Sequence, residues 1–144
     1  MKKNKENNNK KFILDKYRQD VFPPYTLYVI MYHDSKDITD LFVWDDGAEI
    51  EPVDINTYQG ATYGHVYKKD DKDKKPAVLV GLNMNSLDNE IDAINTIAHE
   101  GSHVVFRILD YCNINLCECT NETFAFMQGW ATRSIWNSYK NNKK

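Results

Sequence analysis

The spacing of apolar residues changes along the chain. Residues 11–22, "KFILDKYRQDVF", carry apolar side chains at roughly helical spacing before two prolines, which predicts a first helix. Residues 25–33, "YTLYVIMYH", are β-branched and aromatic and predict a central strand. Residues 60–68 and 76–83 predict a strand pair, because two apolar runs flank the charged connection "KDDKDKK".

A less regular stretch lies between the first predicted strand and this pair. Residues 41–44, "LFVW", are followed by the turn signal "DDG" and by "AEIEPVDI" over residues 48–55. This stretch predicts either a hairpin or one strand followed by an irregular excursion. Pro52 makes the second half an edge strand or a loop.

The second half of the chain has a helical period. Residues 87 to about 111 predict a long helix, with Ser86 as a plausible N-cap. After the loop "CNINLCEC", a second helix is expected from about Asn121 to Tyr139, with Thr120 as its cap. The core stripe expected on the first of these helices consists of Ile91, Ile94, Ala98, Gly101, Val105, Ile108 and Cys112.

The order of these elements predicts an α+β fold. After the first predicted helix the strands precede the two long helices, so we expect a small mixed or antiparallel sheet with both C-terminal helices packed on one face. The 144 residues fit one domain, residues 12–144, behind a polar tail, residues 1–11. Apolar residues make up 42% of the chain, enough for a packed core.

Charge and targeting signals exclude several classes of partner. The net charge of -3 offers no basic excess for a nucleic acid. Neither a signal peptide nor an apolar run of membrane-spanning length is present, so no membrane partner and a cytoplasmic location are expected. Three cysteines, Cys112, Cys117 and Cys119, lie in one loop; their odd number predicts reduced thiols rather than a disulfide framework.

The long helix contains a candidate metal site, "HEGSH". His99 and His103 are four residues apart, so both imidazoles can reach one point beside the helix. Two neutral imidazoles bind Zn²⁺ at roughly 2.0–2.1 Å, and an open position holds a water whose pKa falls to about 7. Glu100 is rotated by about one hundred degrees from His99, so it is a candidate general base rather than a ligand.

A third ligand is expected downstream. Glu122, in "TNETFAFMQGW", follows His103 by nineteen residues and lies near the start of the last helix, which would hold it rigidly. Glu118, in the loop "CEC", is the competitor. One of the cysteines is a weaker third choice, because thiolates also bind zinc.

The pairing of "HEGSH" with "NETFAF" resembles the gluzincin branch of the zincin metallopeptidases over roughly residues 76–139. The resemblance implies a zinc-dependent peptidase, with ligands His99, His103 and Glu122 and with Glu100 as base. It also implies a small sheet whose edge strand binds a peptide as an added strand, and residues 76–83 match that strand by position. More loosely, the chain is similar to short metallopeptidase-like proteins encoded by tailed phages.

The chain departs from the gluzincin pattern at the residues that support the metal ligands. Phe126 stands where thermolysin-like members have an Asp that supports a ligand His, so Asp92 and Asp110 are the candidate supports. Donors for a bound carbonyl are poorly defined, and the candidates are Arg133, His65, Tyr63 and Tyr111.

The residues are compatible with two functions. The first is a zinc peptidase that acts on a peptide or protein. The second is a catalytically silent zincin-fold protein, for example a virion component, that keeps zinc for stability. The presence of Glu100 favours the first, because a structural zinc needs no base, and a groove that opens onto the ion would favour it further. The substrate and the oligomeric state do not follow from the residues.

Overall fold

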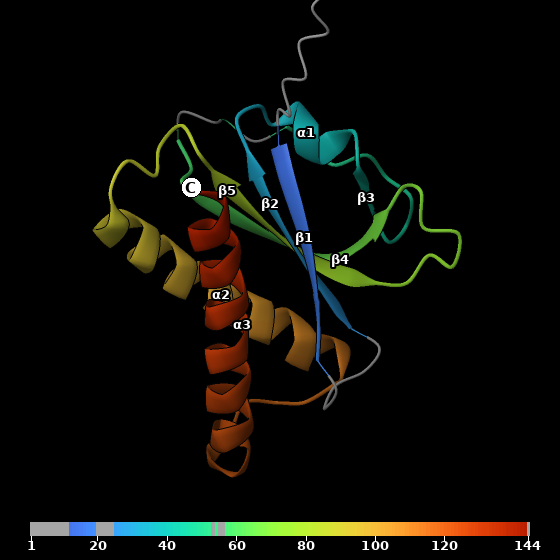
Figure 1. Cartoon of the computed structure of the whole chain (residues 1–144). Helices are drawn as coiled ribbons and strands as arrows, with labels where there is room; N and C mark the ends of the chain where they lie inside the picture. The colour runs from blue at the N-terminus through green and yellow to red at the C-terminus, as the bar shows by residue number, and fades with distance from the viewer. Residues whose placement is uncertain (1–11, 20–24, 53, 55–56, 144) are drawn as a thin grey trace, which may run out of the picture.

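Five strands form a mixed sheet in a computed structural model that describes residues 12–19, 25–52, 54 and 57–143 (Figure 1). Across the sheet the strands follow the order β1 (Phe12–Arg18), β2 (Thr26–Tyr32), β5 (Ala77–Asn83), β4 (Gly60–Lys68) and β3 (Phe42–Trp44). The central pair, β2 and β5, is parallel and every other neighbouring pair is antiparallel. The tail, residues 1–11, lies outside the described residues.

The helices come mainly after the sheet. A short helix, α1 (Lys36–Thr39), follows β2, and the long helices are α2 (Glu90–Tyr111) and α3 (Asn121–Asn142), with a 3-10 turn, η1 (Glu118–Thr120), between them. Together with the sheet they make the α+β fold that the element order predicted. No helix in the described part of the chain is long and apolar enough to cross a membrane.

Two hydrophobic clusters cover the two faces of the sheet. Alternate residues of β2, such as Leu27 and Val29, pack with α2 and α3. The residues between them, such as Tyr28 and Ile30, face α1 and the β3 region. Both long helices therefore lie on one face, as expected from the sequence.

The first predicted helix is wrong over residues 12–18, which form strand β1, while residues 11 and 20–22 lie outside the described residues. The strand pairs with β2 over its whole length, from Phe12 opposite Tyr32 to Arg18 opposite Thr26. Its side chains alternate, with Ile13 on the helix-covered face and Leu14 on the other. Pairing with the buried strand β2 satisfies one backbone edge of β1 and partly buries both of its faces, and this outweighs the local helical spacing.

The predicted start and core stripe of α2 are partly wrong. Asn89 caps the helix by accepting a hydrogen bond from the Asp92 N–H at 2.9 Å, whereas the Ser86 hydroxyl donates to the Asn83 carbonyl. Ile91 is 72% exposed and Ile94 is 49% exposed. Ala98 and Cys112 are exposed as well. Gly101, Val105 and Ile108 are buried as predicted, and the rest of the buried side consists mainly of Ala93, Ile97, Val104 and Leu109.

Two further expectations need correction, and the structure decides between the two alternatives for the stretch after β3. Residues 77–83 form β5, which lies between β2 and β4 rather than at an edge of the sheet. Among the described residues after β3, Glu49 alone bridges back to Val43, so of the two expected alternatives the strand followed by an irregular excursion is the one found. Cys117 and Cys119 form a disulfide, so the prediction of reduced thiols is wrong for that pair, whereas Cys112 is free.

Candidate metal centre

Helix α2 approaches β4 closely because small residues on the strand face it. A Cβ added to Gly60 would lie 2.8 Å from Thr96 Cγ2 and 2.9 Å from Glu100 Cγ. Thr62, two residues along the strand, donates a hydrogen bond to Glu100. A larger side chain at position 60 would push the helix off the strand, so this glycine places the "HEGSH" turn against the sheet.

His99 and His103 lie side by side on the exposed face of α2. Their Nε2 atoms are 3.1 Å apart and their ring centroids 4.7 Å apart. Two imidazole nitrogens on one tetrahedral zinc ion at the usual bond lengths would be about 3.3 Å apart. The separation and the donor chemistry of this pair therefore fit one ion, and without an ion the two rings can share one N–H hydrogen bond.

Glu100 points from the same turn toward the sheet. It is only 5% exposed, and its Oε2 accepts a hydrogen bond from the Thr62 hydroxyl at 2.6 Å. A buried carboxylate is costly unless it is hydrogen-bonded, so this contact is needed to hold the charge there. Glu100 is thus held by the strand and next to the His pair, not among its ligand nitrogens.

A groove of about 430 Å³ opens onto this turn. Residues Thr57, Tyr58, Gln59 and Gly60 line its strand side, and Asn95, Thr96, His99 and Glu100 line its helix side. Both the exposed His99 imidazole and the Glu100 carboxylate therefore border space that a ligand can enter.

The structure does not bring Glu122 to the His pair. Phe124 packs against Phe106 of α2, with ring centroids 5.3 Å apart, and Glu122 is rotated by about 200° from Phe124 around α3. Glu122 and its competitor Glu118 are both exposed. Among the described residues, no group of three or more His, Cys, Asp and Glu side chains could hold a metal ion.

The carboxylates predicted to support the ligand imidazoles have other partners. Asp92 belongs to the N-cap of α2, where its Oδ2 accepts from the Asn89 amide at 2.6 Å. Asp110 lies 3.6 Å from His65 Nε2. It follows His103 by about two helical turns, roughly 10 Å along the axis. Neither contact orients His99 or His103.

The predicted carbonyl donors are also spread over the molecule. His65 and Tyr111 form a cluster with Tyr25 at the C-terminal end of α2, where the Tyr25 hydroxyl and His65 Nδ1 are 2.7 Å apart. Tyr63 belongs to the cluster on the opposite face of the sheet, and Arg133 is exposed on α3. A transition-state donor is therefore not assigned to any of the four.

The Glu100 carboxylate contributes to the raised pKa of two buried tyrosines. Burial raises the pKa of Tyr32 to about 12, and the Glu100 carboxylate adds to that rise. Burial likewise raises the pKa of Tyr63, with smaller contributions from Tyr32 and Glu100. Both phenols are therefore neutral near pH 7 and add no charge beneath the site.

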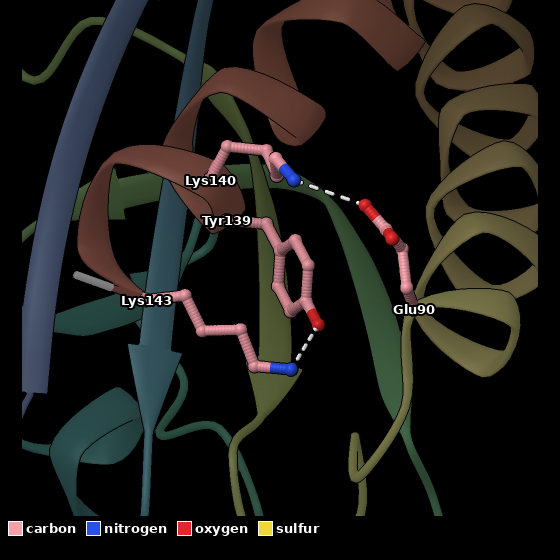
Figure 2. A pocket seen from close by; sticks show the side chains of 4 residues that line it. All are labelled: Glu90, Tyr139, Lys140 and Lys143. Atoms are coloured by element: carbon pink, nitrogen blue, oxygen red, sulfur yellow. Dashed lines mark hydrogen bonds and ion pairs between the residues drawn. The ribbon is translucent and has the colours of Figure 1, made fainter.

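A second hollow lies where α2 begins and α3 ends (Figure 2). Lys140 Nζ lies 2.9 Å from Glu90 Oε1, and Lys143 donates to the Tyr139 hydroxyl. The hydrogen bond from Lys140 lowers the pKa of Glu90. Glu90 precedes His99 by nine residues, roughly 13 Å along the helix, so these contacts join the helix ends and lie apart from the His pair.

Thr62 and Gly60 are the site residues that were missed in the sequence. Their signal was present in "GATYG", where positions 60, 62 and 64 alternate on the strand face that meets α2.

Comparison of the chain with protein-family models, curated proteins and solved structures found no match.

Proposed function

We propose that the protein is a zinc-dependent peptidase in which His99 and His103 hold the ion and Glu100 acts as general base. The observation that carries the proposal is the pair of Nε2 atoms 3.1 Å apart, beside a fixed, buried carboxylate and an open groove. Bound zinc would act as a Lewis acid and make water a nucleophile near neutral pH. Glu100 would accept the proton of that water and return it to the leaving amine.

A peptide substrate would lie along β4 rather than β5. Strand β3 pairs only with Val66–Lys68 of β4, so no described strand pairs with the outer edge of Gly60–Gly64. This segment runs into the groove at Gly60. An extended peptide added at that edge would place its backbone next to Glu100 and His99.

The third ligand remains a prediction. Glu122 is in the first turn of α3 and would have to rotate toward α2 to join the imidazoles. If it does, Glu122→Ala weakens zinc affinity strongly, while Glu118→Ala leaves the affinity near that of wild type. Zinc titration of both variants measures this, and the reverse result would move the site into the cysteine loop.

The decisive experiment combines metal analysis with turnover. Protein purified without chelator and reconstituted with zinc should hold one equivalent and cleave an unstructured protein such as casein. Glu100→Gln keeps the shape of the side chain but cannot accept the proton, so it should retain zinc while activity falls by about 10² or more. Loss of zinc in Glu100→Gln would instead make Glu100 a ligand.

The alternative is a catalytically silent protein on the same scaffold. It is favoured by the position of Glu122, because a His pair alone leaves the ion with fewer protein ligands than catalytic zinc sites have. Zinc bound at one equivalent, with no hydrolysis and with a higher melting temperature, is the result expected of this alternative.

A further inference from the structure

We infer that Thr62 is a positioning residue. Its hydroxyl, on strand β4, sets the orientation of the Glu100 carboxylate before any metal binds. The inference rests on the proposed role of Glu100 as base and adds a residue from a distant part of the chain. Thr62 and Glu100 are thirty-eight residues apart in sequence, and their side chains meet at 2.6 Å.

The hydroxyl distinguishes the two carboxylate oxygens. Thr62 Oγ1 lies 2.6 Å from Glu100 Oε2 but 3.4 Å from the Glu100 backbone carbonyl, so the carboxylate is its main acceptor. The other oxygen, Oε1, lies on the Gly60 side, 3.2 Å from where a Cβ at position 60 would be. Because Gly60 lines the groove, Oε1 is the oxygen available to a water molecule there.

Burial makes this contact effective. Glu100 is 5% exposed, so few water molecules can compete for Oε2 or let the side chain turn. Without the Thr62 hydroxyl, the buried carboxylate would lose the one side-chain donor found for it among the described residues. It would then rotate toward solvent to recover hydration, and the base would leave its place beside the His pair. A base out of position lowers the rate of the chemical step more than it weakens substrate binding.

The first test needs neither metal nor activity. In zinc-free protein, Thr62→Val should lower the melting temperature by about 3–6 °C, because it removes a hydrogen bond to a buried charge. In a Glu100→Ala background, Thr62→Val should lower the melting temperature by less than half as much. If the alanine variant does not fold, Glu100→Met replaces it. Equal losses in both backgrounds would show that the bond does not hold Glu100, and would overturn the inference.

The second test uses the zinc-loaded protein and a peptide substrate. Thr62→Val should lower kcat by at least about tenfold and change KM by less than about threefold, with zinc content unchanged. Thr62→Ser, which keeps the hydroxyl, should restore most of kcat. Thr39→Val, the same change in α1 on the other face of the sheet, should behave as wild type. A kcat for Thr62→Val within twofold of wild type, or no rescue by serine, would refute the positioning role.

The two tests separate the inference from the proposed function. Absence of zinc binding and hydrolysis in the wild-type protein would refute the peptidase. The melting-temperature cycle would still decide whether Thr62 holds Glu100.

Discussion

At the scale of single residues, the hydroxyl of Tyr32 is buried without a hydrogen-bond partner among the described residues. An unpartnered buried hydroxyl loses its hydration without compensation. Tyr32→Phe should therefore raise the free energy of unfolding by about 1 kcal/mol at pH 7. The matched control is Tyr17→Phe, because the Tyr17 hydroxyl lies 2.8 Å from Ser138 Oγ, and this variant should lose about 1 kcal/mol. Chemical denaturation measures both, and equal effects of the two substitutions would contradict the assignment.

The raised pKa of Tyr32 predicts how the stability of the folded protein changes at alkaline pH. Its pKa is raised from 10.0 to about 12 in the folded protein, mainly by burial. The unfolded chain therefore releases the Tyr32 proton at a lower pH than the folded protein does. The stability that the protonated phenol contributes below pH 10 is lost as the pH rises from about 10 to 12. Tyr32→Phe should make the decline in melting temperature over that range shallower. An unchanged slope would show that Tyr32 does not control it.

At the scale of elements, the crossing of α2 and α3 depends on Gly101. A Cβ at this position would lie 2.7 Å from Thr132 Oγ1 and 3.4 Å from the Thr132 backbone nitrogen. Gly101→Ala should therefore force the helices apart and lower the free energy of unfolding by about 1–3 kcal/mol. Because His99 and His103 flank this glycine, Gly101→Ala should also lower the affinity for zinc. Thermal unfolding and zinc titration measure the two effects.

Gly129 on α3 provides the control for that prediction. A Cβ there would meet nothing within 4 Å, and the position is exposed within a helix. Gly129→Ala should therefore raise the free energy of unfolding by about 0.5–1 kcal/mol, because alanine loses less backbone entropy in a helix. If both alanine variants are stabilised, the helices do not pack closely at Gly101.

At the scale of the whole molecule, the sheet, α2 and α3 share one core, so an ion bound on α2 would be coupled to global unfolding. Zinc at about 100 times its Kd should stabilise the folded protein by about 2.7 kcal/mol and raise the melting temperature by several degrees. Chelator should reverse the shift. His103→Ala should melt at one temperature with or without zinc, and a zinc-dependent shift in that variant would place the ion elsewhere.

The sequence by itself determined the parts of the molecule that depend on local spacing. Residues i and i+4 of any helix lie one turn apart, so "HEGSH" placed His99 and His103 side by side whatever packed around them. The apolar runs of β2, β4 and β5 and the order of strands before helices likewise predicted the α+β class and the helix-covered face. Predicting these features does not require knowing how the helices and strands pack against one another.

Only the tertiary structure decided the features that depend on distant contacts. Residues 12–18 became a strand because β2 was available to pair with them. Ile91 and Ile94 became exposed because α2 turns Ala93 and Ile97 toward the sheet. Thr62 meets Glu100, and Glu122 stays exposed and apart from the His pair, because of how β4 and α3 lie against the same helix. Helical periodicity shows which side chains share a stripe, but what covers that stripe is set by the packing of elements far apart in the chain.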